Sequence, residues 1–411
     1  MIGTVQTRRA PLGTGFWIFA VGQVVSGTGT GMELLALTWA VLGRDQLGVG
    51  TPLLSVILLA LFGPSVALGQ VAGRIVDRWS RERVLVATLA LQAAAATTVG
   101  FALIAGHLSV PLLLGYALVL GLLQACEVPA RQVFLMDLLG EDFKRGYSVY
   151  IVMSGVARMA GLALAGRLIV ELGTGPVFVL NGLTFALVIC AVLAAARSPA
   201  RPVTHWPPAA AGPVTVPSSV AEIYLLVFVI GAIGNQFPVT NALMTLRVFD
   251  GDAAAYGDLG AAAAVGAILG AAAATRLPDS RALMLLAALS FGVFEVLAGT
   301  MRHYLGYAAV LLVVAASFSV FITAAVAQVR RRVAGDRLGR AMAWYNAALT
   351  GCVPVGTLVV GAIADHLGTR SSLILPGIAI AVAALVALSR IAVRPRYPMP
   401  GSGECDGVGD E

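Results

Sequence analysis

Four polar side chains share one face of an apolar stretch close to the N-terminus. Their spacing of 3, 4 and 3 residues places them on one side of an α-helix. The four are Gln23, Ser26, Thr30 and Glu33. A carboxylic acid in low-dielectric surroundings holds its proton more strongly, so Glu33 can alternate between a proton and a cationic substrate. The other interpretation is a static role, in an ion pair or as a neutral, hydrogen-bonded acid.

A second polar stripe consists of Gln124, Glu127 and Arg131, which repeat at helical spacing. Glu127 and Arg131 are four residues apart, so they can take part in function or simply pair at a helix end. Arg158 lies about 11 residues into a later apolar run, near its middle, where its side chain cannot easily reach the membrane surface. We therefore expect a carboxylate partner, with Glu127 and Glu33 as the nearest candidates. A pair that breaks on protonation would couple proton movement to conformational change, whereas a permanent pair would be structural.

The elements that carry these residues are predicted to be membrane-spanning helices. Apolar residues make up 58% of the 411 residues and charged residues only 12%, about half the usual charged fraction of roughly 25%. Such a composition excludes a soluble globule, a disordered chain and a disulfide scaffold. One span needs about 20 apolar residues. We predict twelve, at 15–42, 52–74, 84–106, 110–131, 147–170, 175–196, 222–246, 255–275, 282–301, 304–327, 341–364 and 372–393.

The spans fall into two halves. Residues 197–221 are rich in proline, which cannot continue a helix, and are predicted to be a cytoplasmic linker. The linker separates a six-helix bundle at 1–196 from a second at 222–393, and residues 394–411 are predicted to be a disordered cytoplasmic tail. The second half repeats the first at an offset of 195 residues. The matched residues are Glu141, Arg145, Tyr150, Gly161, Gly166 and Gly173, and then Asp336, Arg340, Tyr345, Gly356, Gly361 and Gly368. Repeated halves of this kind are typical of transporters whose substrate site lies between them.

Basic residues are distributed unequally over the predicted loops. This topology assigns 21 Lys and Arg residues to one side and four to the other, with Arg158 and Arg167 inside a span. The positive-inside rule then places both termini and the linker in the cytoplasm. Orientation therefore accounts for the net charge of +6, and no nucleic-acid partner is needed.

Several kinds of chemistry lack their motifs in this sequence. There is no phosphate-binding loop for ATP, no serine, histidine and aspartate set in the loops, and no cysteine spacing suited to a metal. We therefore expect neither an enzyme nor a bound cofactor or metal. Energy for any transport would come from an ion gradient or from the gradient of the substrate itself.

The loop between the second and third predicted spans resembles the signature loop of the major facilitator superfamily. It combines a glycine, an acid and three bases: Gly73, Asp77, Arg78, Arg81 and Arg83. Ser80 stands where the family usually has glycine. The resemblance implies a cytoplasmic latch that stabilises one access state and releases in the other. The alternative is that these arginines only fix orientation and contact lipid headgroups.

Other motifs resemble the enterobactin-exporter and macrolide-efflux branch of that superfamily. They include Pro129 and Arg131 followed by Asp137, and glycines 161 and 166, although Leu162 stands where antiporters usually have proline. The resemblance implies a monomeric, multi-pass protein of the cytoplasmic (inner) membrane. It further implies proton-coupled export of small amphipathic compounds such as drugs, macrolides or siderophores by rocker-switch alternating access. An importer or uncoupled facilitator, and a scaffold or sensor that transports nothing, are the alternatives.

In the resembled fold, spans 1, 4, 7 and 10 line the substrate cavity. The implied cavity residues are Gln23, Ser26, Thr30, Gln124, Asn235, Gln236, Thr240, Asn241, Ser319 and Thr323. Glu295 lies in the ninth span, at the periphery of that fold, and is expected to point into the bundle toward a structural partner. The glycines of the fifth span, and Gly266 with Gly270 in the eighth, are expected to permit close helix packing.

Overall fold

A computed structural model describes residues 12–42, 50–68, 79–197, 218–234, 236–278, 280–333 and 338–393. Within these ranges the secondary structure is helical throughout. The helices of the first half are α1 (Thr14–Leu42), α2 (Gly50–Ala67), α4 (Arg81–Ile104), α5 (Val110–Leu139), η1 (Gly140–Asp142), α6 (Phe143–Leu172) and α7 (Thr174–Ala196). Those of the second half are α8 (Ser218–Ile233), α9 (Phe237–Leu243), η2 (Met244–Val248), α10 (Ala253–Ala274), α11 (Arg281–Thr300), α12 (Tyr304–Arg332), α13 (Leu338–His366) and α14 (Ser371–Val393).

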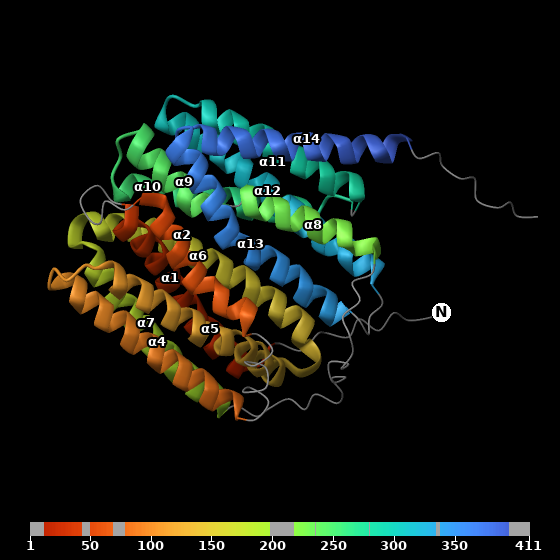
Figure 1. Ribbon diagram of the computed structural model, residues 1–411. Coiled ribbons are helices and arrows are strands. Elements are labelled where there is room, and N and C mark those ends of the chain that lie inside the picture. Colours follow the sequence, from red (N-terminus) through yellow and green to blue (C-terminus); the bar gives the residue numbers. More distant parts are fainter. Residues whose placement is uncertain are drawn as a thin grey trace, which may run out of the picture.

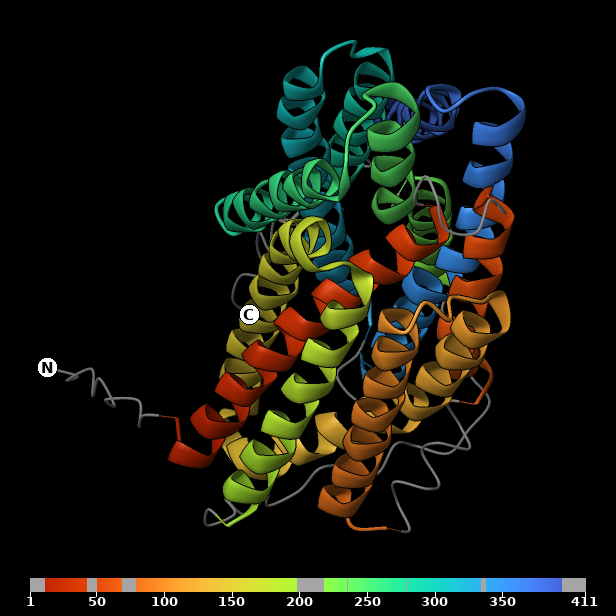
Figure 2. The same cartoon turned by 90° about the vertical axis from the view of Figure 1, so that its left-hand side faces the viewer.

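The helices form two bundles that lie one above the other in Figure 1. In the first bundle α1 packs against α6 and α7, as Figure 2 shows, while α4 packs against α5 and α7. The second bundle repeats most of this arrangement, because α8 packs against α13, and α11 against α12 and α14. With α8 and α9 counted as one interrupted helix, the structure confirms the predicted fold of twelve helices in two pseudo-symmetric halves.

The sequence repeat has a counterpart in the packing. Tyr150 and Tyr345, which are matched at the offset of 195, are both buried. An added Cβ at Gly161 would lie 2.0 Å from the Thr28 carbonyl oxygen in α1, and one at Gly356 would lie 1.7 Å from the Ala232 carbonyl oxygen in α8. Each glycine therefore lets α6 or α13 approach the first helix of its own half, where no other residue fits.

The most extensive contacts between the halves are those of α6 with α10 and of α2 with α13, and α1 also contacts α9. The tightest described approach between α6 and α10 is at Gly166, where an added Cβ would lie 2.4 Å from the Ala253 carbonyl oxygen. Nearby, Arg167 and Asp258 form an ion pair of 3.5 Å, and the rings of Trp39 and Tyr256 stack with their centroids 6.1 Å apart. The two halves are therefore closed against each other at the end of the bundle where α6 ends and α10 begins.

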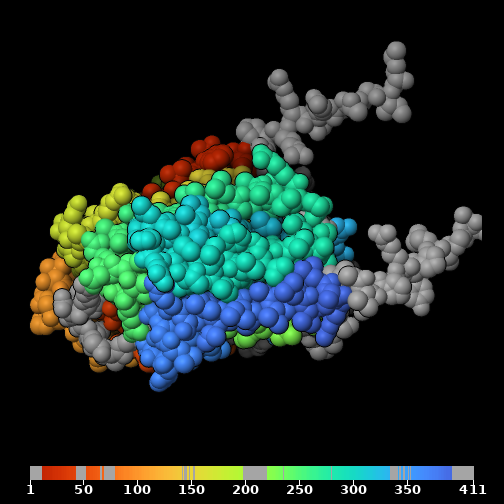
Figure 3. All heavy atoms as spheres, turned by 90° about the horizontal axis from the view of Figure 1, so that it is seen from above, coloured from red at the N-terminus to blue at the C-terminus, as the bar shows by residue number. Residues whose placement is uncertain are grey.

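The outer surface of the bundle is apolar. Figure 3 shows a face made largely by the second half of the chain. In that half, the exposed large apolar side chains of α11 and α14 include Leu286, Val293, Ile378, Val382 and Leu385. Within the described ranges, nine helices are long and apolar enough to cross a membrane. Three predicted spans are not among these nine helices. Helix α1 carries the polar stripe, whereas α2 and α13 contain internal prolines and have only shorter apolar segments.

Some helix boundaries differ from the predicted ones. Helix α5 continues through Pro129 to Leu139, and α12 continues to Arg332, so both extend past the apolar runs that located them. The seventh span is interrupted instead of continuous, because α8 ends at Ile233 and α9 begins at Phe237 with a proline in its first turn. Most of the predicted linker and the whole predicted tail lie outside the described residues.

Candidate functional site

A cavity of about 480 Å³ opens within the first half. It is lined by side chains of α1, α5 and α6, with contributions from α2, α4 and α7. The lining includes Arg158 and every member of the two polar stripes predicted from the sequence: Gln23, Ser26, Thr30, Glu33, Gln124, Glu127 and Arg131. Both predicted polar stripes therefore face the same space.

Glu33 is buried and hydrogen-bonded by two neutral donors. The Tyr116 hydroxyl from α5 donates to its Oε1 at 2.8 Å, and the Asn181 amide from α7 donates to its Oε2. Thr184 in turn donates to the Asn181 side-chain oxygen at 3.0 Å. Among the described residues no cationic side chain pairs with Glu33. Its negative form therefore has no neutralising charge beside it, and only these two hydrogen bonds stabilise it.

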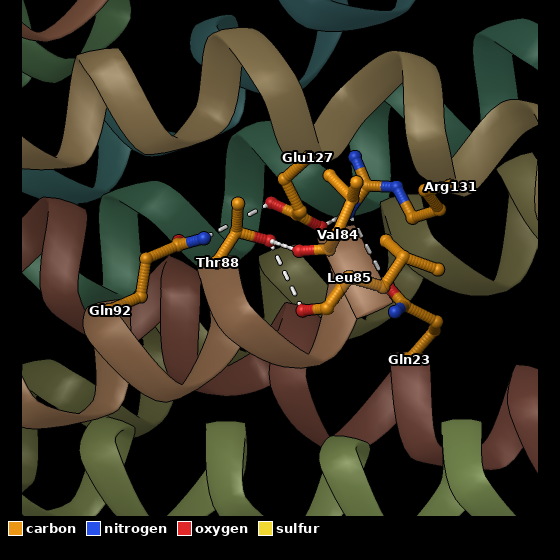
Figure 4. A network of polar contacts seen from close by, with 7 residues as sticks. All are labelled: Gln23, Val84, Leu85, Thr88, Gln92, Glu127 and Arg131. Carbon is orange, nitrogen blue, oxygen red and sulfur yellow. Dashed lines mark hydrogen bonds and ion pairs between the residues drawn. The ribbon is translucent and has the colours of Figure 1, made fainter. Parts of the chain in front are cut away.

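Glu127 pairs with Arg131 along α5. The Arg131 guanidinium donates to Glu127 Oε1 at 2.9 Å and approaches the Gln23 side-chain oxygen at 3.5 Å. On the other side, the Gln92 amide of α4 lies 3.4 Å from Glu127 Oε2, and Figure 4 shows Glu127 between these two partners. The contacts are those of the static ion pair given above as the alternative interpretation, and they join α1, α4 and α5.

Because this pair is largely buried, its loss should be felt in stability. We expect Glu127→Gln to lower the free energy of unfolding by about 1–3 kcal/mol, since Arg131 would keep its charge without a carboxylate. The matched control is Glu222→Gln, which breaks the exposed Glu222–Arg281 pair and should change stability by less than about 1 kcal/mol. Thermal unfolding of both variants in the same detergent measures the difference, and equal effects would contradict a buried-pair role for Glu127.

Arg158 does not have the carboxylate partner that the sequence predicts. Its side chain is exposed to the cavity, and no hydrogen bond or ion pair joins it to another described residue. The reason lies in the neighbouring contacts: Glu127 already has Arg131 one turn away, and Glu33 is held by Tyr116 and Asn181. The expectation of an Arg158 pair with Glu127 or Glu33 was therefore wrong for this conformation.

A second cavity of about 350 Å³ lies between the two halves and is mainly apolar. Leu34 and Phe62 line both cavities, so the two spaces adjoin. The predicted Gln236 and Asn241 line the second cavity. Their side chains already make hydrogen bonds within the protein. The Gln236 amide donates to the Ala232 carbonyl and its oxygen accepts from the Thr357 hydroxyl, and the Asn241 side-chain oxygen accepts from Tyr307 at 2.8 Å.

Three other predicted cavity residues, Thr240, Ser319 and Thr323, line neither of these cavities. The Thr240 hydroxyl donates within its own helix, to the Gln236 carbonyl at 3.1 Å. The Thr323 hydroxyl likewise donates to the Ser319 carbonyl at 2.8 Å, and Thr323 is exposed. A threonine hydroxyl that donates to a backbone carbonyl one turn earlier cannot donate the same hydrogen to a substrate. Asn235 lies outside the described residues.

The predicted latch is described only in part. Arg81, at the start of α4, forms an ion pair of 3.2 Å with Asp137 near the end of α5, and Arg83 is exposed. Gly73, Asp77 and Arg78 lie outside the described residues.

Glu295 is buried in the second bundle, as its sequence position indicates. Its Oε2 has no hydrogen-bond partner within the described structure, so the expected structural partner is not found at this oxygen. In the described ranges, no group of three or more histidine, cysteine or acidic residues is positioned to hold a metal ion.

The sequence reasoning missed the residues that hold Glu33. Tyr116 and Asn181 are single polar groups in apolar helices, without a stripe of their own. The available signal was a polar residue within an apolar helix, since a buried asparagine or tyrosine needs a polar partner. Gln92, which reaches Glu127 from α4, was missed for the same reason.

Two repeated six-helix bundles that enclose a polar cavity with ionisable groups define a membrane transporter of the major facilitator type. The family model described as transmembrane secretion effector matches residues 7–397, and the chain belongs to this family. No curated protein matches the chain in sequence.

Solved transporters share the fold at low sequence identity. The nucleoside transporter NupG aligns with a TM-score of 0.69 at 10% identity, over 92% of this chain and 99% of that one. A POT family transporter in complex with 5-aminolevulinic acid aligns with a TM-score of 0.73 at 10% identity, over 91% and 95%. A bacterial homologue of the human lysosomal transporter Spinster, inward-facing and unoccupied, gives 0.62 at 14% identity, over 92% and 96%. At these identities the likeness shows the fold alone.

Proposed function

We propose that this protein is a secondary active transporter that exports small amphipathic compounds in exchange for protons. The observation that carries the proposal is Glu33, a buried acid that lines the cavity and whose hydrogen-bond partners among the described residues are all neutral donors. A carboxyl group without a counter-charge can take up a proton from one side of the membrane and release it to the other when access alternates. The apolar second cavity beside it supports an amphipathic substrate.

The proposed direction of transport, export, is supported by the orientation and by the family together. The excess of arginine on one side supports cytoplasmic termini in the inner membrane, and secretion is the activity in the description of the family. The close contact of α6 with α10 supports a state that is shut at one end of the bundle. In the proposed rocker-switch cycle of a monomer, this contact opens while the basic end closes.

The basic loop is proposed to act as the latch at the cytoplasmic end. Its support is the Arg81–Asp137 ion pair, which joins the beginning of α4 to the end of α5. In the proposed cycle, the charged loop before α4 holds this end in one state and releases it in the other.

The test is transport by the purified protein in proteoliposomes with an imposed pH gradient. A panel of neutral, cationic and anionic amphipathic compounds is offered, and accumulation is measured with and without a protonophore. Proton-coupled export predicts accumulation driven by the gradient and abolished by the protonophore. Flux that runs down the substrate gradient alone, with or without the protonophore, would instead establish an uncoupled facilitator, and no flux of any compound would favour a scaffold or sensor.

A further inference from the structure

We infer that the substrate carries an anionic group, which Arg158 binds in the polar cavity, and an apolar body, which occupies the second cavity. The inference rests on the proposed transport function and names the chemical class of its substrate.

The first step is the balance of charge in the polar cavity. Arg131 is neutralised by Glu127 at 2.9 Å, and Glu33 is held by a hydroxyl and an amide. Arg158 lines the same cavity without a hydrogen bond or ion pair to any other described residue, and the Glu127 carboxylate that attracts it from a distance is already paired with Arg131. A guanidinium keeps its charge in proteins, so it cannot adapt to such a place by deprotonation. An anionic ligand group would supply the missing partner.

The second step is the position of Ser154, one helical turn before Arg158 on α6. Its hydroxyl oxygen is buried and has no hydrogen-bond partner within the described structure, although the residue lines the cavity. A buried hydroxyl without a hydrogen-bond partner is unfavourable, because it has lost its bonds to water and gained none in return. The guanidinium and this hydroxyl lie on the same helix face and can bind one carboxylate together, with the fork of the arginine supplying two donors.

The third step is the space beside this pair. Met159, which follows Arg158 in the chain, and Leu162 line the second cavity together with Phe237 and Phe318. Two residues, Leu34 and Phe62, line both spaces. A molecule with its acidic group at Arg158 would therefore extend its body among aliphatic and aromatic side chains, which recognise apolar surface and little else. Selectivity would then be strict for the acidic head group and tolerant toward the body.

The test compares ligands that differ only in the head group. The probes are 1-naphthaleneacetate, 1-naphthaleneacetamide and 2-(1-naphthyl)ethylamine, together with a second set of three built on an indole body. Binding is measured by equilibrium dialysis against the full chain in nanodiscs of phosphatidylcholine, so that no lipid with a net negative charge is present. In at least one set we expect the acid to bind about tenfold more tightly than the amide, and the amine to bind most weakly.

The variants assign this preference to one side chain. Arg158→Gln should remove the preference of acid over amide, Arg158→Lys should keep part of it, and Arg302→Gln, at an exposed arginine, should leave it unchanged. Ser154→Ala should weaken binding of the acid more than binding of the amide. Elution as a single species in gel filtration shows that each variant is folded.

Two results would overturn the inference. One is equal or weaker binding of the acid than of its amide in both sets, including no binding at all. The other is an acid preference that persists in Arg158→Gln. The same measurements on Glu33→Gln separate this inference from proton coupling, because the head-group preference should survive in that variant. Binding of acids without gradient-driven transport would leave the inference in place and refute the proposed coupling.

Discussion

Glu33→Gln is expected to abolish transport driven by a pH gradient while it leaves the protein folded. Glutamine has nearly the same shape as glutamic acid and can still accept the hydrogen bond from Tyr116. The Asn181 amide, however, would then face another amide group, and the loss of one acceptor should lower stability by only about 1 kcal/mol. What glutamine cannot do is exchange a proton. The gradient-dependent part of the flux should therefore fall to the level seen without a gradient.

The measurement is uptake into proteoliposomes, at equal protein density, over a series of imposed pH gradients. Exchange of substrate between the two sides without a gradient should persist in Glu33→Gln, because that reaction needs the cavity and the rocking motion alone. Glu127→Gln is the matched control, since it removes the second acid that lines the cavity and one that is already neutralised by Arg131. If Glu127→Gln loses coupling and Glu33→Gln keeps it, the proton site lies on α5 and the assignment of Glu33 is wrong.

The fold could be predicted because its causes are periodic and local. The sequence itself displays apolar runs of spanning length, the repeat at offset 195 and the small residues of α6. The structure confirms the two pseudo-symmetric halves that these features predict. The interruption between α8 and α9 was missed. The sequence does carry a signal for it, because Gly234, Asn235 and Gln236 lie at the break and Pro238 follows in the first turn of α9, where a proline cannot continue the preceding helix.

The candidate site was predicted where one helix determines it and missed where several helices meet. The spacing of Gln23 to Glu33 sufficed to place that stripe in the cavity. The partners of Glu33 come from α5 and α7, at sequence separations of 83 and 148 residues, and depend on how three helices are rotated. Arg158 illustrates the same limit. The topology brings Glu127 and Glu33 near it, but Arg131 pairs with Glu127, and Tyr116 and Asn181 bind Glu33.

Gly166→Ala is expected to open the contact between the two halves and to impair transport. The added Cβ would lie 2.4 Å from the Ala253 carbonyl oxygen and 2.9 Å from the Gly257 Cα, both of them backbone atoms of α10. Backbone in a helix cannot turn aside as a flexible side chain can, so α6 and α10 must move apart. Overpacking of this kind costs about 1–3 kcal/mol. Only the conformation with this end closed bears that cost, so the equilibrium between access states should shift by about 5- to 150-fold.

Gly155→Ala provides the control on the same helix, because a Cβ at that position meets nothing within 4 Å. It should raise stability by about 0.5–1 kcal/mol through helix propensity and leave transport intact. The position of the equilibrium can be read from cross-linking of Arg167→Cys with Asp258→Cys, whose native side chains form the ion pair between the halves. In a background without the native cysteines, the yield should fall in Gly166→Ala and stay unchanged in Gly155→Ala. Equal yields and equal transport in the two variants would show that the halves do not need this close approach, and the closed end would then have to depend on the contacts of α2 with α13.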